Sequence, residues 1–388
     1  MSESIPINAE VLKWARVSAG LTVDEVVLKI KRKHVTHDVI NAWEQGSEAP
    51  NYAQLERLAY DVYKRPLAIF FFPTPPEEVS AKQSFRTLPE YEIENMPSKI
   101  RLLLRRAQAY QLNLYELYDN TNPADKKIIK DLSFDLSISI PEMAKQVRDY
   151  LAITLDDQAS FGNPENAFKQ WRKILEESGV FTFKDAFKED SFSGFCLYDE
   201  KFPVIYVNNS KSFTRQIFTL FHELAHILFK TGGIDTRIED YINYLDGDDQ
   251  RIEIICNHFS GEFLVPSENF NSKTSNIEVN DDSICLLANT YNVSREVILR
   301  KFLDHGRIDQ LYYHRKVDSW KKQPTANKPS SGGNYYFTKG AYLGGKYIEK
   351  AFSQYYQKRI TAERLADYLG VKVKNISGIE SLLYKTEP

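Results

Sequence analysis

The sequence predicts a multidomain protein that is mainly α-helical and contains one small mixed β-sheet. A chain of 388 residues is long enough for two or three domains, because domains commonly hold about 100–200 residues. Apolar residues recur at helical spacing along most of the chain, and a hydrophobic fraction of 42% is sufficient for packed cores. Three short apolar runs, at 180–183, 195–198 and 204–207, are instead typical of strands, and they precede a long apolar helix.

Overall charge and cysteine content narrow the classes of function. A net charge of −3 gives no general attraction to nucleic acid or membranes, so any DNA binding must be local. The three cysteines, Cys196, Cys256 and Cys285, are far apart and odd in number, which favours reduced thiols in a cytosol over a disulfide framework. The first residues show no basic-then-apolar signal, and no run of about 18 apolar residues occurs. We therefore expect a soluble, cytoplasmic protein without a membrane partner.

Residues 1–75 predict an all-α domain of short helices joined by turns. Thr22, with Glu25 three residues later, is typical of a capping box at the start of one helix. Thr36 is the expected N-cap of the next helix, and Pro50 precedes a further one. The domain holds nine Lys/Arg and nine Asp/Glu residues, so it is not basic overall.

This domain resembles the XRE-type helix-turn-helix through Ala19-Gly-Leu-Thr22 and through Trp43-Glu-Gln-Gly46 followed by Pro50. The resemblance implies that the helix from Thr36 to Glu44 enters the major groove of DNA. The Lys-Arg-Lys cluster ahead of this helix can hold phosphates. Because the charge of the domain is balanced, a protein-docking role or a homodimer contact stays open as the alternative. The expected DNA contacts are Lys31, Arg32, Lys33, Thr36, His37, Asp38 and Asn41.

The residues His222-Glu-Leu-Ala-His226 carry the strongest chemical signal in the chain. Two histidines four residues apart on a helix lie on one face, so both rings can reach one metal ion. Glu223, directly after the first histidine, can take a proton from a water at that metal. Apolar residues on both sides predict a buried helix, in which histidines without partners would be costly. A catalytic zinc site needs a third protein ligand and one open position.

The third ligand is expected in the segment from Glu253 to Pro266, whose apolar positions suit a second buried helix that ends before the proline. Glu253, Cys256 and His258 are the three candidates in this segment. Cys256 shares a helical face with Glu253, so the spacing of the residues does not choose between the two.

The two motifs together resemble the ImmA/IrrE family of zinc metallopeptidases, in which a helical His-Glu-x-x-His is followed by Glu-x-x-Ala-Asn-x-Phe-Ala-x-x-Leu-Leu-Met-Pro. The resemblance implies that His222, His226 and Glu253 bind zinc and that Glu223 is the general base. A site of two histidines and one glutamate also tolerates manganese. The resemblance further implies a zincin-like core with a small mixed sheet, one edge strand of which pairs with an extended peptide substrate. Other matching positions are Asn257, Phe259, Leu264, Pro266, the segment 203–208 and Arg215, whereas Cys256, Ser260 and Val265 depart from the family pattern.

The expected domain plan has five parts. Residues 1–75 form the helix-turn-helix domain, 76–163 a helical connector, 164–320 the peptidase core with a helical extension, 321–334 a linker and 335–388 a helical C-terminal domain. The linker is assigned because it is rich in Lys, Pro, Ser and Gly. The C-terminal part resembles the tails of long XRE–peptidase fusions, which are often encoded beside a toxin with a PIN-type nuclease fold.

From these features we expect a zinc-dependent endopeptidase fused to a DNA-binding domain. The family resemblance suggests that it cleaves a regulatory protein such as a repressor in a stress, phage or toxin–antitoxin response. The alternative is a non-enzymatic transcriptional regulator or antitoxin that binds DNA and a toxin partner, with zinc in a structural role. Glu223 favours the enzyme, because a structural zinc site has no need of a base between its ligands.

Overall fold

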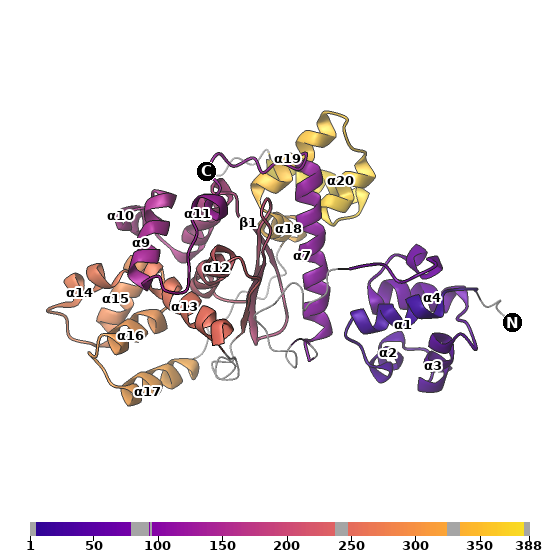
Figure 1. Cartoon of the computed structure of the whole chain (residues 1–388), viewed down its shortest axis with the longest axis horizontal. Coiled ribbons are helices and arrows are strands. Elements are labelled where there is room, and N and C mark those ends of the chain that lie inside the picture. The colour runs from indigo at the N-terminus through magenta and orange to yellow at the C-terminus, as the bar shows by residue number, and fades with distance from the viewer. Residues whose placement is uncertain (1–4, 79–92, 94, 237–246, 324–333, 384–388) are drawn as a thin grey trace. The chain divides into compact units, whose positions relative to one another are not determined.

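The computed structural model describes residues 5–78, 93, 95–236, 247–323 and 334–383 (Figure 1). The chain divides into two units, one built from 1–84 and 88–106 and the other from 85–87 and 107–388. Helices predominate in both units, and the second unit also holds a four-stranded sheet. The prediction of a mainly helical protein with a small mixed sheet is therefore confirmed. Residues 79–92 and 94 of the predicted connector and residues 324–333 of the predicted linker lie outside the described residues.

The first unit is helical throughout its described part. The apolar faces of its helices meet in one core that includes Trp43. Two predicted helix starts are confirmed. The Thr22 N–H donates to Glu25 Oε2 at 2.8 Å and the Glu25 N–H donates to Thr22 Oγ1 at 3.2 Å, while Thr36 Oγ1 accepts from the Val39 N–H at 3.4 Å. The elements are α1 (Ala9–Ser18), α2 (Val23–Ile30), α3 (His37–Gln45), α4 (Tyr52–Arg57), the π-helix η1 (Leu58–Tyr63), the 3₁₀-helix η2 (Leu67–Phe71) and the first part of α7 (Ser98–Leu117).

The second unit surrounds a mixed sheet with helices. The strand order is β1-β3-β2-β4, with β1 parallel to β3 and with β2 antiparallel to both β3 and β4. The strands are β1 (Phe181–Asp185), β2 (Phe192–Leu197), β3 (Val204–Asn208) and β4 (Ile234–Thr236). The helices are α8 (Ile128–Asp131), α9 (Ile140–Leu151), α10 (Leu155–Ser160), α11 (Pro164–Glu177), α12 (Phe213–Leu228), α13 (Gly247–Leu264), α14 (Ser267–Thr274), α15 (Asp281–Tyr291), α16 (Arg295–Asp304), α17 (Gln310–Lys321), α18 (Tyr335–Leu343), α19 (Gly345–Tyr356), α20 (Ala362–Leu369), the 3₁₀-helix η4 (Val373–Asn375) and α21 (Ile376–Leu383).

Helices cover both faces of this sheet (Figure 1). Side chains alternate between the faces along a strand, so Phe183 and Lys184 of β1 point in opposite directions. The Phe183 ring stacks on Tyr110 of α7, with the ring centroids 4.7 Å apart, and meets Tyr347 of α19 at 5.1 Å. Lys184 points instead to α11 and α12, where its Nζ lies 4.3 Å from the centroid of the Phe168 ring. The α11–α12 face is the one on which the histidine motif lies.

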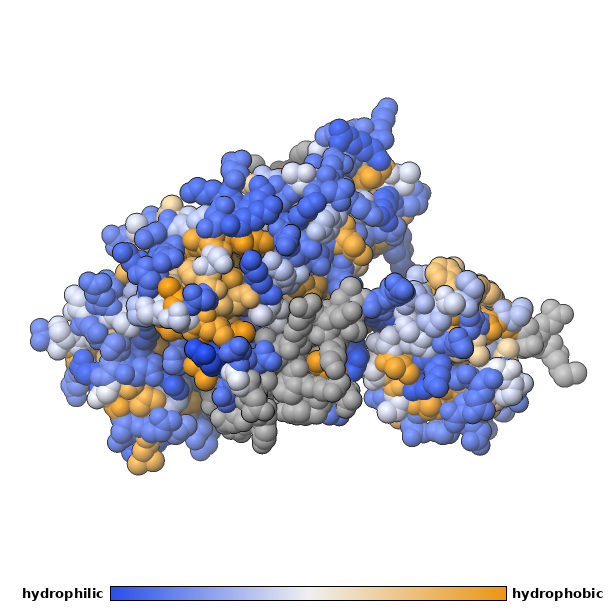
Figure 2. All heavy atoms as spheres, viewed as in Figure 1, coloured by the Kyte–Doolittle hydropathy of each residue, from blue (hydrophilic) through white to orange (hydrophobic). Residues whose placement is uncertain are grey.

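Buried polar side chains hold the C-terminal end of α13. Arg148 of α9 donates to the Phe263 carbonyl at 2.8 Å, and Gln158 of α10 donates to the Leu264 carbonyl at 2.9 Å. The two side chains are also bonded to each other, because Arg148 Nη1 donates to Gln158 Oε1 at 2.9 Å. These bonds satisfy carbonyls that have no partner within the helix. The segment 140–160, predicted as part of a connector, thus packs on α13. Apolar side chains gather on the surface where α9, α12 and α13 lie (Figure 2).

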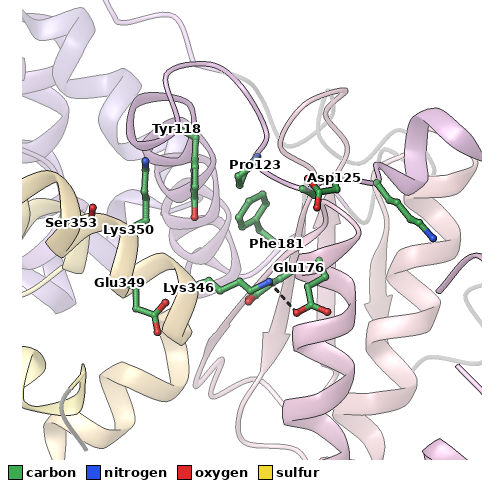
Figure 3. Close-up of a pocket in the computed structure, with 12 residues that line it drawn as sticks. Tyr118, Pro123, Asp125, Glu176, Phe181, Lys346, Glu349, Lys350 and Ser353 are labelled. Carbon is green, nitrogen blue, oxygen red and sulfur yellow. Dashed lines mark ion pairs between the residues drawn. The ribbon is translucent and has the colours of Figure 1, made fainter. Parts of the chain in front are cut away.

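The C-terminal helices pack on α7, α11 and β1 of the same unit. Arg172 of α11 donates to the Ala341 carbonyl at 2.8 Å, and Gln354 of α19 donates to the Leu117 carbonyl at 3.0 Å. An open pocket of about 760 Å³ lies at this junction (Figure 3). Acidic and basic side chains line it together, as where Lys346 Nζ lies 3.6 Å from Glu177 Oε1. None of the described helices is long and apolar enough to cross a membrane.

Candidate metal centre

The helix α12 presents the predicted motif from within the core of the second unit. Strand β3 leads into it, and Ser212 caps its first turn by accepting a hydrogen bond from the Arg215 N–H at 3.3 Å. Every residue of the segment 219–228 is buried. His222, Glu223 and His226 are therefore only 2%, 0% and 0% exposed. Polar groups at this depth are costly unless they are paired or bind an ion.

The helix α13 brings Glu253 to the two histidines, as the family resemblance implied. His222 Nε2 lies 3.2 Å from His226 Nε2. The Glu253 carboxylate lies against both rings, with Oε1 3.2 Å from His226 Nε2 and Oε2 3.5 Å from His222 Nε2. Glu253 is itself only 1% exposed. The donor atoms of all three residues lie within 4.8 Å of one another, so one small cation can contact them together.

These separations fit a tetrahedral zinc site. Where metal–ligand bonds measure about 2.0–2.1 Å, two ligand atoms at the tetrahedral angle are about 3.3–3.4 Å apart. The two histidine nitrogens are 3.2 Å apart, and each has one Glu253 oxygen at a similar separation, Oε1 at 3.2 Å from His226 and Oε2 at 3.5 Å from His222. Two imidazole nitrogens and a carboxylate are donors that suit zinc and also tolerate manganese. The residues present are therefore a suitable ligand set for a divalent cation.

The structure also separates the three candidates for the third ligand. The group of mutually close donor atoms contains Glu253 together with the two histidines. His258 is exposed on the other side of α13. Cys256 is fully buried and lies beside the His226 ring, but it is not a member of that group. The geometry therefore favours Glu253 over Cys256 as the third ligand, whereas the spacing of the residues in the sequence does not choose between them.

Two further side chains that contact the site were not expected from the sequence. Thr231, just after α12, places its Oγ1 3.3 Å from His226 Nδ1. Cys196 of β2 lies near enough to Glu223 for the carboxylate to act on its thiol electrostatically, and the thiol donates to the Thr231 carbonyl at 3.9 Å. The signal in the sequence was the glycine pair at 232–233, because adjacent glycines after a buried helix often mark a close approach of backbone and side chain.

Burial and neighbouring groups shift several pKa values around the site. Burial acts to lower the pKa of His226, but Cys256 and Glu253 beside the ring outweigh it and hold the pKa well above its ordinary value. Burial, and after it the Glu223 carboxylate, raises the pKa of the Cys196 thiol well above its usual range. Burial likewise raises the pKa of Cys256. Both thiols are thus protonated at neutral pH, and Cys196 can donate its proton to the Thr231 carbonyl, 3.9 Å away.

A comparison with protein families agrees with this geometry. Residues 175–303 match the model of the IrrE N-terminal-like domain, Peptidase_M78. The match supports a zinc-dependent metallopeptidase of the IrrE/ImmA type, and its range contains both α12 and α13. The Peptidase_M78 range begins within α11 and ends within α16, so α9, α10 and the C-terminal helices lie outside it. No curated protein matches the chain at a significant level.

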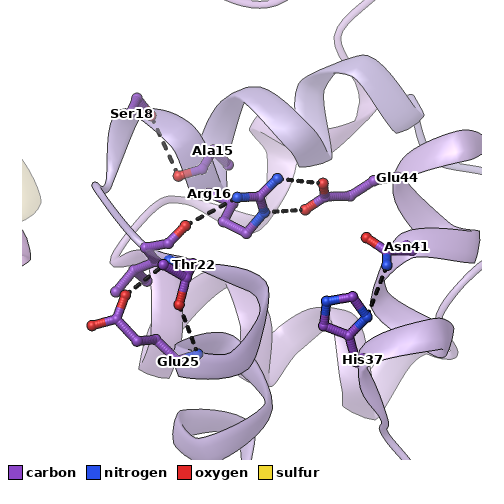
Figure 4. Close-up of polar contacts among 9 residues, drawn as sticks. Ala15, Arg16, Ser18, Thr22, Glu25, His37, Asn41 and Glu44 are labelled. Carbon is purple, nitrogen blue, oxygen red and sulfur yellow. Dashed lines mark hydrogen bonds and ion pairs between the residues drawn. The ribbon is translucent and has the colours of Figure 1, made fainter. Parts of the chain in front are cut away.

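The candidate DNA contacts lie in the first unit, outside the Peptidase_M78 range. They occupy the turn between α2 and α3 and the first turns of α3. Lys31 ends α2 in a left-handed conformation, with φ of 51°, and so turns the chain toward α3. His37 Nδ1 and Asn41 Nδ2 lie 3.0 Å apart on α3 (Figure 4). The exposed candidates are Lys31, Arg32, Lys33, Thr36, His37 and Asp38, whereas Asn41 is half-buried.

A two-point ion pair fixes α3 to α1 behind these residues (Figure 4). Arg16 Nε lies 2.7 Å from Glu44 Oε1, and Arg16 Nη2 donates to Glu44 Oε2 at 2.8 Å. The third nitrogen, Nη1, donates to the Leu21 carbonyl at 3.0 Å. The two side chains are 15% and 6% exposed, so the pair is largely removed from water. Such a planar, two-point contact holds the direction of α3 more firmly than a single hydrogen bond would.

Proposed function

We propose that this protein is a zinc-dependent endopeptidase that acts in the cytoplasm and cleaves a regulatory protein. The observation that carries the proposal is the convergence of His222, His226 and Glu253 at separations suited to zinc, inside the Peptidase_M78 range. Glu223 lies next to the first of these ligands in the chain. Four protein ligands would close a zinc site, whereas three leave one position for water and substrate.

The buried groups have separate roles in the proposed hydrolysis of a peptide bond. When bound, zinc supplies a Lewis acid that makes a water more acidic and polarises a substrate carbonyl. Glu223 takes a proton from the attacking water and passes it to the leaving amine, as a general base and then a general acid. Because Glu223 is fully buried, its interactions with neighbouring charges are screened less than they would be in water.

The surroundings of the site suit a polypeptide substrate. Apolar side chains gather on the surface where α12 and α13 lie, and such patches favour contact with another protein (Figure 2). In the described sheet β4 is an edge strand, and an edge can pair with an extended peptide through backbone hydrogen bonds. Backbone pairing is common to all sequences, so selectivity must come from other contacts. A repressor or another regulator in a stress, phage or toxin–antitoxin response is the substrate class that we propose.

The test is incubation of the purified protein with proteins encoded by neighbouring genes, with and without Zn²⁺. We expect one of them to be cleaved only when zinc is present. The variant Glu223→Gln should keep its zinc but cleave at least about 100-fold more slowly, because it lacks the base. Cleavage by this variant at the wild-type rate would exclude the proposed role of Glu223. Stable binding of a partner without cleavage by the zinc-loaded protein would instead support a non-enzymatic regulator or antitoxin.

We also propose that the first unit binds DNA through the turn between α2 and α3. The support is an exposed cationic cluster, Lys31, Arg32 and Lys33, ahead of a capped helix that is anchored to α1. Replacing all three residues by Ala should weaken binding to any DNA and reduce the salt slope by about three. Asn41→Ala should mainly relax sequence preference. If neither the protein nor the triple variant shifts its own promoter DNA at low salt, a protein-docking or homodimer role is favoured.

A further inference from the structure

The chain folds back on His226 directly after α12. Lys230 adopts a left-handed conformation, with φ of 59°, and so reverses the chain direction. Thr231 then returns to the helix end, where both its backbone N–H and its hydroxyl donate to the His226 carbonyl, at 2.9 and 3.0 Å. The side chain of Thr231 is therefore held in one orientation by the same residue whose ring it contacts.

The hydroxyl of Thr231 selects one tautomer of the His226 ring. Its single proton is used in the bond to the His226 carbonyl, so the oxygen faces Nδ1 as an acceptor, 3.3 Å away. Nδ1 must then carry a proton in either charge state of the ring, so when the ring loses one proton the lone pair is left on Nε2. Nε2 is the nitrogen that lies 3.2 Å from both His222 Nε2 and Glu253 Oε1. Thr231 thus prepares the ring to bind a metal through Nε2.

Gly233 provides the space that the same ring occupies. A Cβ atom at this position would lie 2.3 Å from His226 Cδ2 and 2.4 Å from Cγ, which is far inside contact distance. The backbone of Gly233 is tied to the sheet, because its carbonyl accepts from the Cys196 N–H at 2.9 Å and its N–H donates to Cys196 Sγ at 3.2 Å. A side chain at 233 would therefore have to displace the ring or break this strand contact.

We propose that residues 231–233 are the positioning element of the metal centre. Thr231 sets the tautomer of His226, and Gly233 supports the face of its ring. The same segment also holds Cys196 of β2, through the Gly233 N–H at 3.2 Å and the Thr231 carbonyl at 3.9 Å. One short segment thus positions a metal ligand and ties it to strand β2 of the sheet. This inference rests on the proposed function, because it takes His226 to be a metal ligand.

The test compares zinc dissociation constants, measured by competition with a chromophoric chelator on the full-length protein. Gly233→Ala should weaken zinc binding at least about tenfold, and Thr231→Val should weaken it about 10–100-fold. Thr231→Ser keeps the hydroxyl and should stay within about threefold of wild type. The matched control is Gly261→Ala on α13, where an added Cβ meets no atom within 4 Å. This control should leave zinc affinity unchanged.

Three outcomes separate this inference from the proposed function. Wild-type protein that binds no zinc would overturn the peptidase proposal itself. Wild-type affinity in both Gly233→Ala and Thr231→Val would overturn only the positioning role of residues 231–233. Circular dichroism of the metal-free variants identifies any failure to fold. If Gly233→Ala does not fold, the zinc affinities of Thr231→Val and Thr231→Ser provide the test. Equal affinities of these two variants would refute the proposal that Thr231 sets the tautomer of His226.

Discussion

Replacing Lys184 by Met should stabilise the second unit at neutral pH, and the gain should shrink as the pH rises. Lys184 is only 4% exposed, and its Nζ lies 4.3 and 5.1 Å from the centroids of the Phe168 and Phe213 rings. Burial, and after it the charge of Arg172, lowers the pKa of Lys184 from 10.5 to about 7. Because the pKa of Lys184 is lower in the folded state than in the unfolded state, the unfolded chain binds more protons between about pH 7 and pH 10.5. The free energy of unfolding therefore rises with pH across that window.

The size of the effect follows from the lowered pKa. Burying the charged Lys184 side chain lowers the free energy of unfolding by about 5 kcal/mol well below pH 7, since each pKa unit corresponds to about 1.4 kcal/mol. The cost falls to about 4 kcal/mol at pH 7 and about 2 kcal/mol at pH 9, where the folded form is already neutral. Attraction between the ammonium and the two rings offsets about 1–2 kcal/mol at pH 7. Met has a similar volume and no charge, so we expect a gain of about 2–3 kcal/mol at pH 7 that is largely lost by pH 10.

Urea unfolding in the presence of a chelator measures this difference without a contribution from bound metal, whose affinity also depends on pH. Hydrogen exchange of α11 and α12 in rising urea reports on the second unit, whereas intrinsic fluorescence would also include Trp14 and Trp43 of the first unit. Lys173→Met is the control, since Lys173 is exposed on the same helix and its removal should change stability by less than about 0.5 kcal/mol at any pH. A gain for Lys184→Met that is constant between pH 7 and 10, or a loss of stability at pH 7, would refute the reasoning.

Three other perturbations test separate parts of the molecule. Trp171→Ala should lower the free energy of unfolding of the second unit by about 3–5 kcal/mol, because it leaves a large cavity in the core; calorimetry would show a much smaller change if neighbouring rings closed that space. Glu253→Ala should lose most of the zinc found by elemental analysis, whereas Cys256→Ala should retain it, and the opposite pattern would make the thiol the third ligand. Arg16→Ala should destabilise the first unit by about 3–5 kcal/mol, because the Glu44 carboxylate stays largely buried without its partner. Hydrogen exchange in α1 and α3 measures this last effect, and unchanged protection would mean that the pair contributes little.

The centre of the site could be predicted because its strongest signal is local. His222 and His226 are one helical turn apart, so their convergence follows from helix geometry alone. The choice of Glu253 needed more than local geometry, because Cys256 is one turn further along the same helix. Only the packing of α13 against α12 brings the carboxylate among the imidazole nitrogens. The family resemblance implies Glu253 as the third ligand, and the distances between the donor atoms give a physical reason to prefer it to Cys256.

The features that the sequence did not reveal depend on contacts between distant segments. Arg148 and Gln158 fall in a stretch predicted as a connector, and nothing in their spacing shows that they bind the C-terminal carbonyls of α13. Strand β4 has three residues, which is too short for an alternating pattern to be recognised. Thr231 and Cys196 support the site from a turn and a strand, so their roles appear only when the backbone path is known.

The three cysteines give the metal centre a chemical reporter. Cys196 and Cys256 are buried against Glu223 and His226, whereas Cys285 is partly exposed on α15. A thiol reagent should therefore modify about one cysteine per native chain quickly and the other two only when the strand or helix that carries them moves away from α12. The slow phase of labelling measures how often the metal centre opens, and this measurement requires no substrate. Bound zinc should slow that phase, because it stabilises the closed arrangement of its ligands.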